Sequence, residues 1–349
     1  MIQANSSKSS ILLIYTGGTI GMREDPSDMT LKPFDFSQIL AEVPELKKFA
    51  FRIDSYTFSP LIDSSDVEPG LWQKLAFLIK EKYDFYDGFI ILHGTDTMSY
   101  SASALSFMLD GLTKPVIFTG SQLPIGVPRT DGKENLISAV EIASAKDING
   151  HAKVPEVCVY FDSLLMRGNR TTKINADSFK AFYSPNCSPL AEAGIKIKYY
   201  DEIIRKPLDW YQNISINTNL DTRVSILKLH PGITPEVVRY FICSPETRAV
   251  IMETYGSGNA PSCSWFIDII REAYQNDKII INVTQCLTGT VNMDLYATGK
   301  SLEKVGVING YDSTTESVLA KLFYLMGKSS DNEWVRRMMS KNLKGEISS

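Results

Sequence analysis

The sequence predicts an α/β fold in which a larger, mostly parallel N-terminal α/β domain is followed by a smaller C-terminal α/β domain. Short apolar runs alternate with amphipathic segments, and this order is typical of a parallel sheet that helices cover on both faces. The chain has 349 residues, more than a single core usually supports, so two domains are expected. A polar stretch around 201–222 interrupts the alternation and separates two sets of elements.

The N-terminal domain is assigned to residues 1–205. Its strands are expected where short apolar runs are bounded by polar or turn residues, at 11–15, 51–58, 88–92, 115–119 and 155–161. Its helices are expected between the strands, at 35–42, 68–82, 97–109 and 132–145. The helix at 97–109 has the clearest pattern, because Leu105, Met108 and Leu112 recur at helical spacing.

The domain linker is placed at 206–222, which contains Pro207 and several asparagines and shows little periodicity. The C-terminal domain is assigned to 223–349 and repeats the alternation on a smaller scale. Its expected strands are 223–229, 247–252 and 278–283, and its expected helices are 234–242, 262–275, 314–326 and 331–341.

Composition excludes several classes of protein. A net charge of -4 argues against a nucleic-acid partner, which usually requires a basic surface. No run of about 18 apolar residues is present, so no membrane partner or transmembrane helix is expected. Residues 1–10 are polar and the apolar run 11–14 is too short for a signal peptide, so the chain is expected to be cytoplasmic.

Neither a metal nor another cofactor is expected. The three histidines are far apart and lack the spacing of metal ligands, and the odd number of five cysteines, without a Cys-x-x-Cys pair, does not indicate a disulfide framework.

Two threonine-bearing segments carry the strongest functional signal. Tyr15-Thr16-Gly17-Gly18-Thr19-Ile20-Gly21 and His93-Gly94-Thr95-Asp96-Thr97-Met98 each follow an expected buried strand. Ligands of open α/β sheets bind at this carboxyl edge. Two hydroxyl-bearing loops at this edge indicate nucleophilic catalysis on a small polar substrate. For the first loop alone, a plain strand turn and a phosphate site are the alternatives, but its glycine spacing fails the dinucleotide-binding pattern.

Threonine is a weak nucleophile that needs a neighbouring base, and Lys173 is the candidate for a base. A lysine held against Asp96 would pass protons through Thr95. Each residue also has a structural alternative: Asp96 can cap the helix that starts near Thr97, and Lys173 can be a solvated surface lysine.

Three further loops follow expected strands. Asp63-Ser64-Ser65-Asp66 can bind a small zwitterion or simply cap the next helix. Tyr255-Gly256-Ser257-Gly258-Asn259 and Thr284-Gln285-Cys286 lie at strand ends of the second domain, from where they can reach a ligand, including one held by a neighbouring subunit.

The two threonine segments together closely resemble the two signatures of the bacterial-type L-asparaginase family. The resemblance extends over nearly the whole chain, through 61–66, 119–122, 167–173, 255–261 and 292–299. It is strongest to the cytosolic type I group, because Ser65 stands where the secreted type usually has glutamine.

The resemblance implies hydrolysis of L-asparagine to L-aspartate and ammonia, without metal or cofactor, by a homotetramer built as a dimer of dimers. By motif, Thr19 corresponds to the nucleophile that forms an acyl-enzyme. Thr95, Asp96 and Lys173 correspond to the proton-relay triad, and Asn259 resembles a residue that enters a neighbour's active site. The expected substrate-binding residues are Gly18, Asp63, Ser64, Ser65, Thr95, Asp96, Asn259 and Tyr296.

The chain departs from the family pattern in two places. The loop 22–31 lacks the tyrosine that many relatives place beside the nucleophile, and Tyr296 is the candidate replacement. Thr172 and Cys286 match the region of an allosteric asparagine site in some type I enzymes. Glu253, however, stands where the regulated relatives tend to have a basic residue.

Three rival functions fit the same signatures. A glutaminase is the nearest, because excluding one methylene from a pocket changes binding by only about 1–3 kcal/mol. A subunit that deamidates glutamine for tRNA-bound glutamate normally carries an additional N-terminal domain, whereas the first signature starts here at Thr16. A non-catalytic amino-acid sensor is disfavoured, because residues of competent type fill all four catalytic positions.

Overall fold

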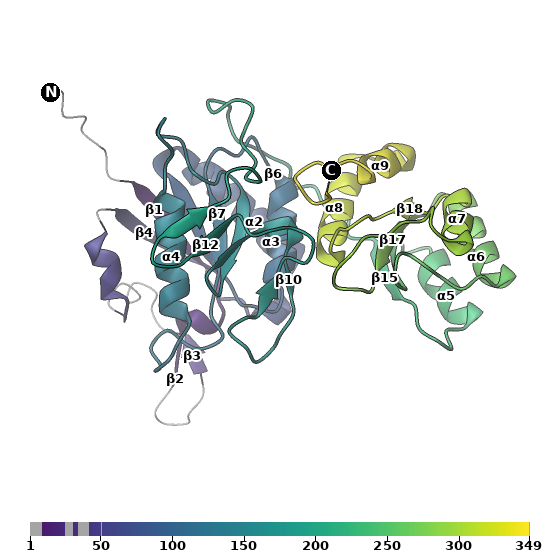
Figure 1. Cartoon of the computed structure of the whole chain (residues 1–349), viewed down its shortest axis with the longest axis horizontal. Coiled ribbons are helices and arrows are strands. Elements are labelled where there is room, and N and C mark those ends of the chain that lie inside the picture. The colour runs from purple at the N-terminus through teal and green to yellow at the C-terminus, as the bar shows by residue number, and fades with distance from the viewer. Residues whose placement is uncertain (1–8, 25–30, 34–41, 50, 349) are drawn as a thin grey trace. The chain divides into compact units, whose positions relative to one another are not determined.

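The computed structural model describes residues 9–24, 31–33, 42–49 and 51–348 (Figure 1). The chain divides into two compact units: an N-unit of residues 1–184 and 188–216, and a C-unit of residues 185–187 and 217–349. Both are α/β units, and the N-unit is the larger, which confirms the predicted fold class. The predicted linker boundaries stay a prediction. The helix expected at 35–42 lies, apart from Glu42, outside the described residues.

An eight-stranded sheet forms the centre of the N-unit, in the order β13-β12-β9-β8-β7-β5-β1-β4. Its parallel strands form where the apolar runs predict them: β1 (Ser10–Tyr15), β4 (Arg52–Thr57), β5 (Gly88–Leu92), β7 (Val116–Thr119) and β8 (Val157–Phe161). The central strands β5, β7 and β8 are buried at every position, which explains why their sequences are continuous apolar runs instead of alternating ones.

Three antiparallel strands extend this sheet beyond the sequence prediction. They are β9 (Leu164–Arg167), β12 (Ala191–Ala193) and β13 (Ile197–Tyr199). The turn between β8 and β9 consists of Asp162 and Ser163, whose φ angles are 48° and 66°. Two-residue hairpin turns with positive φ normally contain glycine or asparagine, so this turn carries no recognisable sequence signal.

Helices cover both faces of the sheet: α2 (Pro69–Lys82), α3 (Met98–Met108) and α4 (Gly132–Ser144). Alternate residues of β1 point to one face, where Leu13 and Tyr15 share a core with Leu136 and Val140 of α4. Helices α2 and α3 contribute nothing to that core and pack instead against each other, with α3 also against β7 and β8. All three helices form where the periodicity predicts them.

Short elements connect these layers. They are η1 (Thr19–Gly21), β2 (Met22–Glu24), β3 (Leu31–Pro33), η3 (Pro44–Lys48), η4 (Ser64–Asp66), η5 (Tyr83–Phe85), β6 (Leu109–Asp110), η6 (Gly168–Arg170), β10 (Thr172–Lys173), β11 (Phe182–Tyr183) and β14 (Ser215–Ile216). Of these, η1 and η4 lie in the loops that follow β1 and β4. In the described part of the chain, no helix is both long and apolar enough to cross a membrane.

The C-unit contains a four-stranded parallel sheet with helices on both sides. Its strands are β15 (Val224–Lys228), β16 (Ala249–Thr254), β17 (Ile279–Thr284) and β18 (Ile308–Asn309), and its helices are α5 (Pro235–Cys243), α6 (Ser264–Gln275), α7 (Ala297–Lys304), α8 (Thr315–Lys328) and α9 (Asn332–Met339). One core joins the sheet to α5, α6 and α7, whereas α8 packs on β15 and β16 outside that core. Sequence reasoning missed α7, which is mostly polar, and β18, which has two residues.

A buried ion pair fixes the C-terminal segment to α8. The Lys321 ammonium lies 2.7 Å from Glu346 Oε1, and the side chains of both residues are at most 2% exposed. Lys321 Nζ also donates hydrogen bonds to the carbonyls of Met339 and Lys341, at 2.9 and 2.5 Å. The segment after α9 is therefore held by charge and by hydrogen bonds in addition to apolar packing.

Replacing Glu346 by alanine is expected to destabilise the chain by about 3–5 kcal/mol, because Lys321 would keep a buried charge without its counter-ion. Equilibrium unfolding in urea measures the change. The matched control is Glu272→Ala, which removes the exposed pair with Arg239 and is expected to cost about 0–1 kcal/mol. Equal losses in the two variants would contradict the assigned role of the buried pair.

Candidate active site

The carboxyl ends of the central strands lie at one level of the N-unit sheet. Tyr15 in β1 pairs with both Thr57 in β4 and Leu92 in β5, and Leu92 pairs with Thr119 in β7. Each of these residues is the last of its strand. The loops that follow therefore leave the sheet side by side, and this register brings the two threonine segments and the segment around Ser64 together.

Two glycines let these loops touch. A Cβ atom at Gly18, whose φ is +93°, would lie 2.6 Å from Gly94 Cα, and a Cβ atom at Gly94 would lie 2.6 Å from Ser64 Oγ. Both distances are shorter than real Cβ contacts, so any larger residue would push the loops apart. Thr19 is the first residue of η1, directly after Gly18, and its side chain is partly exposed.

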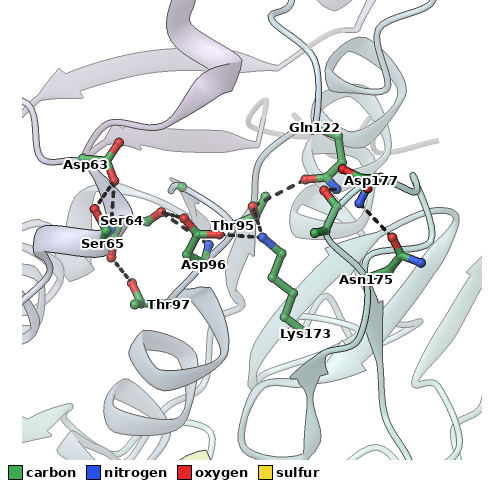
Figure 2. A network of polar contacts seen from close by, with 12 residues as sticks. Asp63, Ser64, Ser65, Thr95, Asp96, Thr97, Gln122, Lys173, Asn175 and Asp177 are labelled. Carbon is green, nitrogen blue, oxygen red and sulfur yellow. Dashed lines mark hydrogen bonds and ion pairs between the residues drawn. The ribbon is translucent and has the colours of Figure 1, made fainter.

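Lys173, Thr95 and Asp96 form one hydrogen-bonded group (Figure 2). Lys173 Nζ donates to Thr95 Oγ1 at 2.8 Å and to Asp96 Oδ1 at 2.6 Å. The Lys173 side chain is 20% exposed and that of Asp96 is 60% exposed. Lys173 is therefore held in place instead of being freely solvated, and Asp96 keeps an open face towards solvent.

Ser64 connects this group to the loop after β4. Its hydroxyl lies 3.3 Å from both Asp96 Oδ2 and the Asp96 amide nitrogen, and its carbonyl accepts a hydrogen bond from Thr97 Oγ1 at 2.7 Å. Thr97, and not Asp96, occupies the N-cap position of α3. The Asp96 side chain is thus directed to Ser64 and Lys173 (Figure 2).

Asp63 has a capping role, but at a different helix from the one that was its predicted alternative. It is the N-cap of η4, and its Oδ1 accepts hydrogen bonds from the amide and the hydroxyl of Ser65, at 2.8 and 2.7 Å. These bonds, the backbone one foremost, hold the pKa of the Asp63 carboxyl below its usual value. The helix that this cluster was considered to cap, α2, has Glu68 at its N-cap instead.

His93 is buried beneath the same loop and forms a directed chain of hydrogen bonds. Its Nδ1 lies 2.7 Å from the Gly94 carbonyl, which only accepts, so Nδ1 carries the proton. Its Nε2 then accepts from Ser101 Oγ at 3.0 Å, and Ser101 accepts from Trp72 Nε1 at 2.9 Å. Burial lowers the pKa of His93 to about 4, so the ring is neutral at physiological pH.

Gln122 belongs to this cluster, although sequence reasoning gave it no role. Its Oε1 lies 3.4 Å from Thr95 Oγ1, and its Nε2 donates to the carbonyls of Ala176 and Ser178, at 2.9 and 3.1 Å (Figure 2). The backbone amide of Gln122 in turn donates to Asp131. The available signals were its place in the loop after the strand that ends at Thr119 and the resemblance of segment 119–122 to the family.

The hydrogen bonds described above do not connect the remaining predicted residues to this group. Thr172 precedes Lys173 in β10, whereas Asn259, Tyr296 and Cys286 belong to the C-unit. Asn259 Oδ1 accepts a hydrogen bond from Thr298 Oγ1 at 2.9 Å, and Tyr296 is half-exposed at the N-cap of α7. No group of three or more histidine, cysteine, aspartate or glutamate side chains in the described residues is arranged to hold a metal ion.

Comparison with known proteins matches both parts of the chain to family domains. Residues 10–205 match the domain described as Asparaginase, N-terminal, and residues 223–339 match the Glutaminase/Asparaginase C-terminal domain. L-asparaginase 1 of Escherichia coli (strain K12) is 44% identical over 344 residues, which cover 97% of this chain and 98% of that protein.

Two further relatives are informative. The crystal structure of L-asparaginase I from Vibrio cholerae superposes with a TM-score of 0.88 at 40% identity and covers 98% of this chain and 100% of that one. A glutamyl-tRNA(Gln) amidotransferase subunit from Sulfurisphaera tokodaii is 34% identical over 352 residues, which cover 97% of this chain and 75% of that protein.

The neutral state of His93 predicts a specific acid sensitivity. The folded pKa of about 4 lies below the unfolded value of 6.5, so the unfolded chain gains a proton at this site first as the pH falls from 6.5 to 4. The contribution of His93 to stability is complete above pH 6.5 and is lost as the pH falls towards 4. In His93→Gln, the free energy of unfolding should fall less steeply over this window, by up to about 1.4 kcal/mol per pH unit.

Urea unfolding at a series of pH values between 6.5 and 4.5 measures the slope. His230→Gln, at an exposed histidine of the C-unit, is the control for loss of an imidazole. Parallel slopes for wild type and His93→Gln would show that His93 titrates normally in the folded chain.

Proposed function

The chain belongs to the asparaginase family, and from this premise we propose that it hydrolyses L-asparagine to L-aspartate and ammonia through a threonine acyl-enzyme. The observation that carries the mechanism is the Lys173–Thr95–Asp96 group beside the loop of Thr19, with Nζ–Oγ1 and Nζ–Oδ1 distances of 2.8 and 2.6 Å. The identity of 44% to an L-asparaginase over nearly the whole chain supports the substrate.

In the first step, Thr19 Oγ attacks the side-chain amide carbon of asparagine. The hydroxyl proton passes to the amide nitrogen, the C–N bond breaks, and ammonia leaves behind an ester between Thr19 and the aspartyl group. We assign stabilisation of the oxyanion to backbone N–H groups near Gly18 and Thr95, and one such donor contributes about 3–4 kcal/mol in comparable sites.

In the second step, water attacks the ester carbon. Thr95 Oγ takes a proton from that water while its own hydroxyl proton moves to Lys173, which acts as the base once its amine is neutral. The Asp96 carboxylate, 2.6 Å from Nζ, stabilises the ammonium that results. When the ester bond breaks, aspartate is released and the Lys173 ammonium returns its extra proton through Thr95 to Thr19 Oγ, which restores the Thr19 hydroxyl and the neutral Lys173 amine.

Substrate recognition is assigned to the residues around this group. We propose that Asp96, whose carboxylate is largely exposed, binds the α-ammonium, and that the hydroxyls of Ser64 and Ser65 bind the α-carboxylate. Gly18 has no side chain, so the substrate is proposed to approach its backbone closely. Asp63 contributes by holding Ser65 through two hydrogen bonds.

The assembly and the cellular location are likewise proposals. The resemblance to cytosolic type I enzymes supports a cytoplasmic homotetramer, a dimer of dimers in which Asn259 reaches a neighbour's active site. Tyr296, half-exposed in the C-unit, is proposed to take the place of the tyrosine that the loop 22–31 lacks. Residues 25–30 of that loop lie outside the described residues.

Glutaminase activity is the second candidate. The C-terminal match names glutaminases together with asparaginases, and one methylene distinguishes the two substrates. Steady-state rates on L-asparagine and L-glutamine with the purified full chain separate these activities from each other, and an absence of ammonia release from both would favour the sensor.

Thr19→Ala is expected to lower kcat on L-asparagine by at least about a thousandfold, because the attacking oxygen is gone. The melting temperature should change little, since the Thr19 side chain is partly exposed. Thr19→Ser is the matched control and should retain measurable turnover. Near-normal turnover by the alanine variant would exclude Thr19 as the nucleophile.

The rate is expected to depend hyperbolically on asparagine concentration. Thr172 and Cys286 are retained as candidates for an effector site. Glu253 stands where the regulated relatives tend to have a basic residue, and its carboxylate accepts a hydrogen bond from Thr315 Oγ1 at 2.8 Å. This charge would repel the carboxylate of an amino-acid effector. A sigmoidal curve that Glu253→Gln leaves unchanged would contradict this reasoning.

A further inference from the structure

A buried tyrosine hydroxyl lies beneath the loop that carries Thr19. Tyr15 is the last residue of β1 and its side chain is fully buried. Its hydroxyl donates a hydrogen bond to the carbonyl oxygen of Gly18 at 3.2 Å. Burial raises the pKa of Tyr15, so the hydroxyl keeps its proton and remains a donor throughout the physiological pH range.

The packing around this hydroxyl explains another glycine of the first signature. A Cβ atom at Gly21 would overlap the hydroxyl end of the Tyr15 ring. The turn from Gly18 to Gly21 therefore wraps over the tyrosine, and the Gly21 amide also donates to the Gly18 carbonyl at 3.3 Å. Tyr15 and the turn are fitted to each other by shape as well as by the hydrogen bond.

Gly18 is a position where the backbone needs such an anchor. Its φ of +93° and ψ of 166° are open to glycine, which has no Cβ to limit rotation of the neighbouring peptide planes. Gly17 precedes it with φ +139°, so two glycines in a row lead into Thr19. Two hydrogen bonds restrain the Gly18 carbonyl: one from the Gly21 amide, which belongs to the same short turn, and one from Tyr15, which anchors the turn to the sheet.

We propose that Tyr15 is a positioning residue for the nucleophile, acting through the carbonyl of Gly18. This inference rests on the proposed function of Thr19. The Gly18–Thr19 peptide is trans, so its N–H points opposite to its carbonyl. By holding the carbonyl towards the core, Tyr15 turns the Thr19 amide away from the core and fixes where the Thr19 side chain begins.

The inference predicts a defect in the chemical step and not in substrate binding. The proposed contacts to the α-ammonium and α-carboxylate come from Asp96, Ser64 and Ser65, which lie on other strand ends. Misplacing a reacting atom by about 1 Å can cost about a hundredfold in rate. Tyr15→Phe should therefore lower kcat on L-asparagine by about ten- to a hundredfold while KM changes less than about threefold.

Tyr83→Phe is the matched control for loss of a buried hydroxyl. Tyr83 is 5% exposed, and its hydroxyl accepts hydrogen bonds from the amides of Thr113 and Lys114, just before β7 begins and thus at the opposite edge of the same sheet. Its loss should lower the melting temperature to a similar degree but leave kcat within about twofold of wild type.

A second variant tests the proposal even if Tyr15→Phe does not fold. p-Aminophenylalanine at position 15, introduced by codon suppression, retains a neutral N–H donor at the same place and should keep kcat within about threefold of wild type. A folded p-aminophenylalanine variant with kcat more than about tenfold low would overturn the proposal. So would a Tyr15→Phe variant with wild-type kcat, or one whose kinetic loss Tyr83→Phe reproduces.

The assay of the wild-type chain distinguishes a failure of the proposed function from a failure of the proposed role of Tyr15. If the wild-type chain releases no ammonia from L-asparagine, the proposed function fails before Tyr15 is tested. If the wild type is active and Thr19→Ala is inactive, an unchanged Tyr15→Phe variant contradicts the positioning role alone.

Discussion

The contact between Gly18 and Gly94 is the constraint on which the rest of the site depends. The parallel register ends β1, β4, β5 and β7 at one level, so their loops compete for the same space above the sheet. Hydrogen atoms in place of side chains let the loops meet. Only then does Ser64 reach Asp96, and only then does Thr19 lie beside the Thr95 loop. Below the contact, Tyr15 bonds to the carbonyl of Gly18 and His93 to that of Gly94, so each loop is anchored to its own strand end.

The fold was largely predictable because its buried strands and helices have the simplest patterns. Continuous apolar runs mark β5, β7 and β8, and helical spacing marks α3. The antiparallel extension was not predictable in the same way. Its first turn, Asp162-Ser163, adopts a glycine-like conformation without glycine, and β12 and β13 are three residues each. Short strands of this kind are stabilised by their neighbours and not by their own sequence.

Some residues of the candidate site were likewise predictable from the sequence, and others were not. Thr95, Asp96 and Lys173 were predicted as a group, and the structure places the Lys173 ammonium within hydrogen-bond distance of both Thr95 Oγ1 and Asp96 Oδ1; their catalytic roles stay a proposal. Gln122 received no role from the sequence because its contact with Thr95 joins loops that follow two neighbouring strands. Tyr15 received none because its contact with Gly18, only three residues away, depends on how the loop turns over the end of the strand. For Asp63, the cap that the structure shows, on η4 and not on α2, is compatible with the proposed functional role, since the same carboxylate also orients Ser65.

The mutual contact of Gly18 and Gly94 has a consequence for how such a site can change over time. A side chain added at Gly18 meets the backbone of Gly94, and no substitution at Gly94 creates room, because Gly94 is already the smallest residue. A side chain added at Gly94 meets Ser64, a residue of the proposed substrate site. Neither glycine can therefore be replaced without disturbing the neighbouring loop. A library built to shift the choice between amide substrates gains more from Ser65, which is exposed, and from Gln122, whose Oε1 lies 3.4 Å from Thr95 Oγ1, than from the two glycines.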